Sequence, residues 1–194
     1  MRPIPAKLGI AFGLVGLTVF VMMYSVAMAS DSSYTFFENY LSDLGVGPGA
    51  WAFNSGVIIA GALLALFAIF GLGRVMGEGC VAKSAKLLLV LCGVFLIGVG
   101  VFNENYDPYH YIFSVSYFLT FLIALIVISV SLFQTKALGR FGVAVSASAS
   151  VLGASLLPMG GSPQSETIAV LAMVVWGILV SSAALLKEYG HKIP

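Results

Sequence analysis

Charged residues and cysteines are both scarce in this sequence. Asp, Glu, Lys and Arg make up only 9% of its 194 residues, against about 25% in an ordinary soluble domain. Its two cysteines, Cys80 and Cys92, would lie about 18 Å apart along a helix, which is too far for a disulfide. Neither a zinc-type cysteine spacing nor a GxxxxGK phosphate loop occurs. These absences exclude a water-soluble globular domain, a cysteine-based zinc site and a P-loop enzyme.

The sequence consists mainly of long runs of apolar residues. Hydrophobic residues form 60% of the chain, and short polar segments divide the chain into six runs. The length of each run lies within or near the range of about 17 to 25 residues that crosses a bilayer. Inside the bilayer a single segment can satisfy its backbone N–H and C=O groups only as a helix. The sequence therefore predicts an all-α, polytopic membrane protein, with a six-helix bundle as one transmembrane domain over residues 1–194. The predicted helices cover residues 8–29, 50–72, 85–102, 111–133, 141–157 and 167–186.

Small residues interrupt several of these runs. Four serines dilute the fifth run, namely Ser146, Ser148, Ser150 and Ser155. A serine-rich span is better buried among other helices than exposed to lipid. Glycines recur in the first two runs, where we expect them to let helices approach one another closely. They are Gly9, Gly13, Gly16, Gly56 and Gly61.

All nine basic residues fall on one side of the predicted membrane. They are Arg2, Lys7, Arg74, Lys83, Lys86, Lys136, Arg140, Lys187 and Lys192. The positive-inside rule makes that side cytoplasmic, which predicts a cell-membrane protein with both termini in the cytoplasm. Six of the eight acids fall on the outer side: Asp31, Glu38, Asp43, Glu104, Asp107 and Glu166. The net charge of +1 therefore hides a polarised molecule, and no nucleic-acid partner is indicated.

The longest connection, residues 30–49, lies on the outer side and has helical spacing. Apolar residues recur at Phe36, Phe37, Tyr40, Leu41 and Leu44. Polar residues fall largely on the opposite side, at Glu38, Asn39, Ser42 and Asp43. We expect a short amphipathic helix here, ended by Gly45. Such a helix either rests in the headgroup layer or forms a lid that turns Ser42 and Asp43 over the bundle.

A second outer segment leads into the fourth predicted helix. Asp107-Pro108 predicts an N-cap followed by proline at the first helical position. This places His110 in the first turn of the helix. Ser114 and Tyr117 then lie one and two turns below it, on the same face.

These segments suggest a candidate site at the outer rim, because a histidine beside acids at the membrane edge can carry protons or bind a metal. The catalytic candidates are His110, Asp43, Glu104 and Ser42. The substrate-binding candidates are Asn54, Ser114, Tyr117 and Glu166. One hypothesis is a membrane enzyme acting on a lipid or lipid-linked substrate, with His110 as general base or metal ligand and Ser42 as nucleophile.

A divalent metal such as zinc suits a site that mixes one imidazole with carboxylates. Its predicted ligands are Asp43, Glu104 and His110. The alternative is a non-enzymatic lipid- or ion-binding or transport protein, in which the same residues hold a headgroup or an ion. Membrane lipids are the predicted partners in both cases. The sequence leaves the oligomeric state open, a homo-oligomer included.

Three motifs in the chain resemble a known family. They are Tyr40-Leu41-Ser42-Asp43-Leu44-Gly45, then Phe53-Asn54-Ser55-Gly56, then Gly100-Val101-Phe102-Asn103-Glu104 with His110 after it. Together they resemble the domain-of-unknown-function family 998 (DUF998) of integral membrane proteins, over nearly the whole chain. More distantly, the Ser-Asp-Leu-Gly turn and the later histidine are similar to the Frag/DRAM/Sfk group of six-helix membrane proteins, some of which are linked to remodelling of lipid anchors. The resemblance implies a six-helix bundle with polar motifs at its outer rim, and it implies no reaction.

The charge pattern makes a direct prediction for Cys80, which lies in a connection rich in basic residues. Because that connection is predicted to be cytoplasmic, a membrane-impermeant maleimide should label Cys80 in inverted vesicles and leave it unlabelled in intact cells. Labelling of Cys80 in intact cells would reverse the predicted orientation.

Overall fold

The chain folds almost entirely into helices. The computed structural model describes residues 5–159 and 161–190, and no strand occurs within them. The long helices are α1 (Ala6–Ser30), α2 (Ala50–Phe67), α4 (Cys80–Val101), α5 (Tyr109–Thr135), α6 (Gly139–Leu156) and α7 (Pro163–Gly190). The short elements are the 3-10 helices η1 (Leu41–Gly45), η3 (Glu104–Tyr106) and η4 (Leu157–Met159), the π-helical turn η2 (Ala68–Leu72) and α3 (Gly73–Met76).

All six predicted membrane helices are confirmed. α2, η2 and α3 run on as one span, Ala50–Met76, and the described residues contain six helices long and apolar enough to cross a membrane. The observed ends differ from the predicted ones by up to five residues, since the third helix begins at Cys80 and not at residue 85. Hydropathy marks the lipid-soluble part of a helix, whereas its backbone hydrogen bonds continue into the polar residues at its ends.

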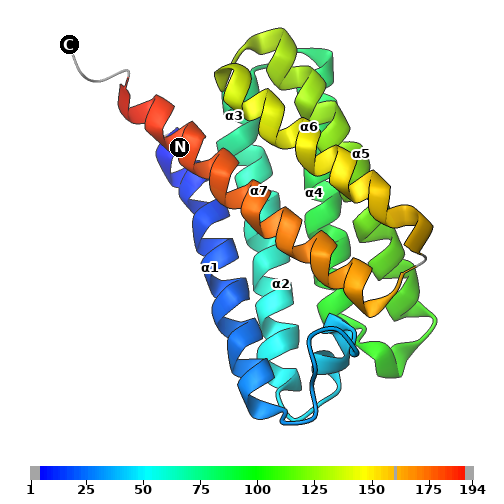
Figure 1. Cartoon of the computed structure of the whole chain (residues 1–194). Helices are drawn as coiled ribbons and strands as arrows, with labels where there is room; N and C mark the ends of the chain where they lie inside the picture. The colour runs from blue at the N-terminus through cyan, green and yellow to red at the C-terminus, as the bar shows by residue number, and fades with distance from the viewer. Residues whose placement is uncertain (1–4, 160, 191–194) are drawn as a thin grey trace.

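The helices form a closed ring (Figure 1). Each long helix packs against the next in chain order, from α1 through α2, α4, α5 and α6 to α7, and α7 returns to pack against α1. At one end of this closing contact, the Lys7 ammonium lies 3.3 Å from the centre of the Tyr189 ring, a cation–π contact between α1 and α7.

Glycines allow the closest helix contacts, as the sequence predicted for Gly9 and Gly61. A Cβ on Gly61 of α2 would lie 2.7 Å from the carbonyl oxygen of Gly93 in α4. A Cβ on Gly9 of α1 would overlap the carbonyl of Phe70 in η2. Both positions therefore exclude a side chain, because backbone cannot move away as a flexible side chain can.

The serines of α6 divide between the bundle and its surface. Ser146 and Ser150 are buried, and the Trp176 Nε1–H of α7 donates a 3.0 Å hydrogen bond to Ser146 Oγ. Ser148 and Ser155 are exposed. The expected burial of this span thus holds for one face only, the face that meets α7.

Charge separates the two ends of the ring. One end, here called the basic end, carries every Lys and Arg among the described residues: Lys7, Arg74, Lys83, Lys86, Lys136, Arg140 and Lys187. Arg2 and Lys192 lie outside the described residues. The other end, the acidic end, carries Asp31, Glu38, Asp43, Glu104, Asp107 and Glu166. The α1–α2 loop and the α4–α5 connection lie at this acidic end, at the bottom of Figure 1.

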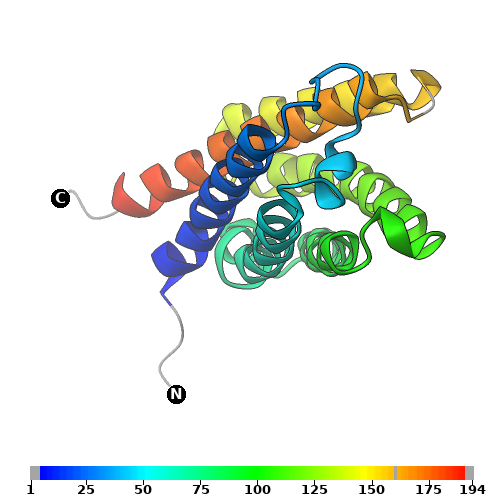
Figure 2. The same cartoon turned by 90° about the horizontal axis from the view of Figure 1, so that it is seen from below.

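The α1–α2 loop is less helical than predicted. Only Leu41–Gly45 is helical, as the 3-10 helix η1, whereas residues 36–38 form a turn. Side chains of α7 donate hydrogen bonds to loop carbonyls that would accept from backbone N–H groups in a longer helix. Gln164 Nε2 donates to Phe37 O at 2.7 Å, and Thr167 Oγ1 donates to Phe36 O at 3.5 Å. Seen from the acidic end, the loop crosses the start of α7 and η1 lies over the middle of the ring (Figure 2).

Candidate functional site

A cavity of about 700 Å³ lies between α5, α6 and α7 at the acidic end, and we call it the lateral cavity. Its polar rim includes Ser42, Glu104, Asp107, His110, Ser114 and Glu166. Its deeper wall is apolar and includes Leu119, Leu122, Ala149, Gly153, Ala169 and Ala172. The cavity therefore combines a polar end with an apolar extension that follows the helices toward the membrane interior.

The lateral cavity opens on the side of the bundle. Three of its lining residues are largely exposed, with Tyr111 at 66%, Leu119 at 45% and Leu157 at 57% of their full area. They belong to α5 and to η4, which follows α6. In a membrane, side chains exposed on the flank of a spanning helix face lipid, so this opening connects the cavity with the bilayer.

His110, at the start of α5, is held in one orientation. The ring is buried, and its Nδ1 lies 2.8 Å from the carbonyl oxygen of Phe102. A carbonyl can only accept, so Nδ1 carries the hydrogen and donates it. In the neutral ring Nε2 is therefore an acceptor, and it lies 3.3 Å from Ser114 Oγ. A backbone carbonyl that sets the tautomer in this way is a common feature of functional histidines.

Ser114 differs from several other bonded serines of the membrane helices. The hydroxyls of Ser25, Ser129 and Ser150 donate to the carbonyl four residues earlier, the usual bond of a serine inside a helix. Ser114 instead turns its hydroxyl toward the imidazole of His110. Both side chains line the lateral cavity.

Glu104 brings a carboxyl group to the same rim from η3. Partial burial raises the pKa of Glu104 above its ordinary value of 4.5, the neighbouring Ser42 hydroxyl lowers it, and the Asp43 carboxylate raises it further. His110 contributes a smaller lowering of this pKa. Glu104, Ser42 and His110 therefore come together in space, although the sequence separates them widely.

Asp43 has a structural role at the start of η1. Its Oδ2 accepts hydrogen bonds from the backbone N–H of Tyr40, at 3.0 Å, and from Asn39 Nδ2, at 3.1 Å. This is the bond that an acid in the first turn makes to a helix N-terminus. Asp43 lines neither described cavity.

Asn54 also supports η1 and does not line a described cavity. Its Nδ2 donates to the Gly45 carbonyl at 2.9 Å, and its Oδ1 is buried without a partner. A side chain on Gly45 would approach Asn54 Oδ1 to 2.8 Å, so this contact needs glycine. Of the site candidates Asp43, Asn54, Glu104 and His110, only Glu104 and His110 line a described cavity.

The predicted metal site is not formed. Among residues 5–159 and 161–190, no group of three or more His, Cys, Asp and Glu side chains is arranged to hold a metal ion. The predicted ligands were Asp43, Glu104 and His110. Asp43 is turned toward the backbone of its own loop, and the nitrogens of His110 face Phe102 and Ser114. We therefore assign no step to a metal.

Glu166 joins α7 to the loop. Its Oε2 accepts a 2.8 Å hydrogen bond from the backbone N–H of Leu41, the first residue of η1. Together with the bonds from Gln164 and Thr167, this contact fastens the loop across the acidic end. Glu166 thus has both a structural bond and a place on the cavity wall.

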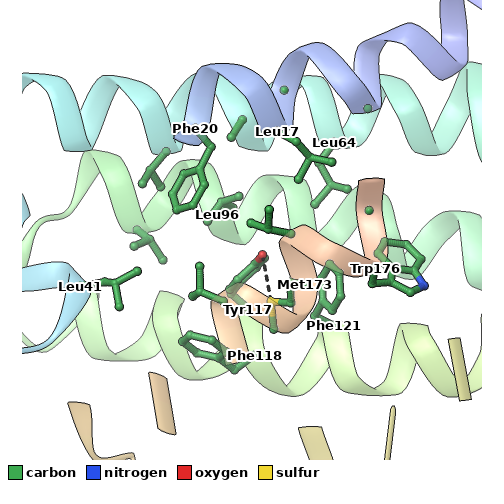
Figure 3. A pocket seen from close by; sticks show the side chains of 18 of the residues that line it. Leu17, Phe20, Leu41, Leu64, Leu96, Tyr117, Phe118, Phe121, Met173 and Trp176 are labelled. Carbon is green, nitrogen blue, oxygen red and sulfur yellow. Dashed lines mark hydrogen bonds between the residues drawn. The ribbon is translucent and has the colours of Figure 1, made fainter. Parts of the chain in front are cut away.

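An inner cavity of about 120 Å³ lies inside the ring (Figure 3). Tyr117, predicted to bind substrate, lines this inner cavity and donates to Met173 Sδ at 3.4 Å. Ser181, also on its wall, is buried with no partner for its hydroxyl. The two cavities adjoin, because they share the lining residues Ser42, Ser114, Phe118, Glu166 and Met173.

The sequence places a polar site at the outer rim, but it predicts neither the apolar wall of the lateral cavity nor the inner cavity. The available signal was a stripe of small residues on each of two helices that follow one another. Ala149 and Gly153 are four apart on α6, and Ala169 and Ala172 are three apart on α7. Such spacing places each pair on one face of its helix. It normally indicates close helix contact, so the pattern alone did not distinguish contact from a cavity.

The pKa of Glu104 predicts how stability depends on pH. Because this pKa is higher in the folded chain than in the unfolded chain, the folded chain binds the proton more tightly. The resulting stability is fully present below the ordinary pKa and is lost as pH rises through the folded-state pKa. We expect Glu104→Gln to raise the Tm in detergent at pH 8, with the gain disappearing near pH 4. Glu38→Gln removes an exposed acid of the same end and is the control. An equal gain in the Tm of Glu104→Gln at both pH values would contradict the explanation.

Comparison with curated proteins and with solved structures gives no match. The family model described as "Protein of unknown function (DUF998)" matches residues 14–186. This range contains all three polar motifs, every lining residue of the lateral cavity, all but Gly13 of the inner cavity, and at least part of every spanning helix. The chain therefore belongs to the DUF998 family of membrane proteins.

Proposed function

We propose that this protein binds a lipid or lipid-linked molecule, with the headgroup at the polar rim of the lateral cavity and the chain along its apolar wall. The observation that carries this proposal is the amphipathic character of the cavity, together with its opening on the flank of the bundle. Its volume of about 700 Å³ lies within the about 300 to 1,000 Å³ typical of ligand sites. A ligand dissolved in the bilayer can enter such a site without crossing water.

The charge distribution supports an orientation for this site. Because basic residues are retained on the cytoplasmic side, we infer that the basic end and both termini face the cytoplasm. The acidic end and the lateral cavity then face the outer leaflet of the cell membrane. The ligand in this proposal is accordingly an outer-leaflet lipid.

A bulky residue on the cavity wall should abolish binding. Ala172→Trp fills the lateral cavity from α7, whereas Leu171→Trp adds the same ring to the neighbouring, lipid-exposed position outside it. After incubation with a total lipid extract in maltoside micelles, native mass spectrometry should count one retained lipid on the wild type and on Leu171→Trp. Ala172→Trp should retain about tenfold less, a loss of about 1.4 kcal/mol.

Equal retention of lipid by both tryptophan variants would contradict the proposal, because the bound lipid would then lie on the general surface of the bundle. Folding of each variant is checked by its thermal melt before lipid is added.

The pairing of Ser114 with His110 favours a second candidate function, hydrolysis of an ester in a lipid substrate. In this scheme Ser114 Oγ attacks the ester carbonyl and its proton passes to His110 Nε2. The departing alcohol takes that proton, and water then releases the acyl group in the same way. Ser42, predicted from sequence as the nucleophile, lines the same rim, but its hydroxyl faces Glu104 rather than His110.

A fluorophosphonate probe distinguishes the two candidate functions. If hydrolysis operates, the probe should label Ser114, and both Ser114→Ala and His110→Gln should reduce labelling about tenfold or more, since loss of a general base costs about 10² to 10⁴ in rate. Ser42→Ala is the matched control and should keep the label. Absence of labelling on the wild type would leave lipid binding as the function.

A further inference from the structure

We infer that the ligand of the lateral cavity carries a positively charged amine headgroup on a long alkyl chain. This inference rests on the proposed function and adds the chemical class of the ligand. It depends on the charges around the rim, on a carboxyl group of which only one oxygen accepts a hydrogen bond, and on the aromatic rings beside these groups.

Among the described residues, the acidic end has no lysine or arginine to balance its acids. All described Lys and Arg residues lie at the basic end, where Lys83 and Glu78 form an ion pair at 3.8 Å. The described residues of the acidic end carry six carboxyl groups and one histidine. A phosphate or carboxylate headgroup needs cationic or N–H donors, and at this rim it would instead meet like charge.

Three of these carboxyl groups line the lateral cavity, those of Glu104, Asp107 and Glu166, and the two glutamates lie on elements far apart in the chain. Glu104 comes from η3 and Glu166 from the first turn of α7. Glu166 uses Oε2 for the Leu41 N–H, and its Oε1 has no hydrogen-bond donor among the described residues. An ammonium group supplies such donors and a compensating charge at once.

His110 does not fill this role in the described structure. Its Nδ1 donates to the Phe102 carbonyl and its Nε2 faces Ser114. Neither ring nitrogen is directed at Glu166. Among the described residues, no lysine or arginine lies beside these carboxyl groups, and the cavity next to them is large enough for a ligand.

Aromatic rings add a second form of recognition. Tyr40, just before η1, and Tyr111, in the first turn of α5, both line the lateral cavity and are both partly exposed. An ammonium group is attracted to the face of a tyrosine ring, whereas an anion is repelled by it. The rings and the carboxylates therefore favour the same charge.

The apolar wall accounts for the alkyl chain. From the rim, the lateral cavity follows α5 down to Leu122 and Leu125, between Gly153 of α6 and Ala172 of α7. No charged residue lines this part of the cavity. A headgroup held at Glu104 and Glu166 would consequently place its chain along these residues.

The test compares three ligands of equal chain length and different headgroup charge: hexadecylamine, hexadecanol and hexadecanoic acid. Binding to the purified full-length chain in maltoside micelles is measured at neutral pH by native mass spectrometry. Hexadecylamine should bind about tenfold more tightly than hexadecanol, and hexadecanoic acid should bind most weakly.

Charge-neutral variants test whether the rim glutamates cause the preference for hexadecylamine over hexadecanol. Glu104→Gln and Glu166→Gln should each reduce the affinity for hexadecylamine toward that for hexadecanol, without changing the affinity for hexadecanol. The glutamine oxygen at position 166 can still accept from the Leu41 N–H, so the loop contact is retained. Glu38→Gln, which removes an exposed acid of the same end outside the cavity, should leave all three affinities unchanged.

The outcomes separate this inference from the proposed function. Equal binding of all three ligands, or strongest binding of the acid, would overturn the amine preference while the lipid site stands, provided that Ala172→Trp still abolishes binding. An equal loss of hexadecylamine affinity in Glu38→Gln would also overturn it, since the preference would then belong to the whole acidic end. If none of the three ligands binds better to the wild type than to Ala172→Trp, the lipid site itself is wrong.

Discussion

Backbone polar groups cannot remain unpaired inside a bilayer, and this requirement shapes the whole bundle. The six spans meet it through their own helical hydrogen bonds, which leaves irregular backbone only at the two ends. At the acidic end, side chains of the helices pair with the loop: Asn54 with the Gly45 carbonyl, Glu166 with the Leu41 N–H, and Gln164 with the Phe37 carbonyl. The polar residues that a functional site needs are thereby collected at one rim.

Helix α7 has the largest part in arranging that rim. It closes the ring against α1, is pinned to α6 through the bond from Trp176 to Ser146, and holds the α1–α2 loop through its first turn. It also contributes Glu166 and Met173 to the walls of both cavities. The position of α7 therefore determines at once the shape of the bundle, the place of the loop and the space available to a ligand.

The sequence predicts all six spanning helices and several of the residues that line the lateral cavity. Hydropathy identified all six spans because burial in lipid leaves a strong compositional signal. The sequence indicates Glu104 and His110 by their place near helix ends and Ser114 by its position one turn below His110, and all three line the lateral cavity. Asp43 and Asn54 were assigned to the same site, but each supports η1 instead. A polar residue at a helix end looks the same in the sequence whether it binds a ligand or fastens its own loop.

The class of protein, the number of its spans and the separation of charge between its ends can be read from the amino-acid sequence, because each follows from composition along a single stretch of chain. The packing of the helices decided that Ala149, Gly153, Ala169 and Ala172 border a cavity rather than a tight helix contact. It likewise decided that Ser114 faces His110 and that Glu104 and Glu166 share one wall. These relations join residues of different helices and turns, so they depend on the angles and distances at which the helices pack, which no local pattern specifies.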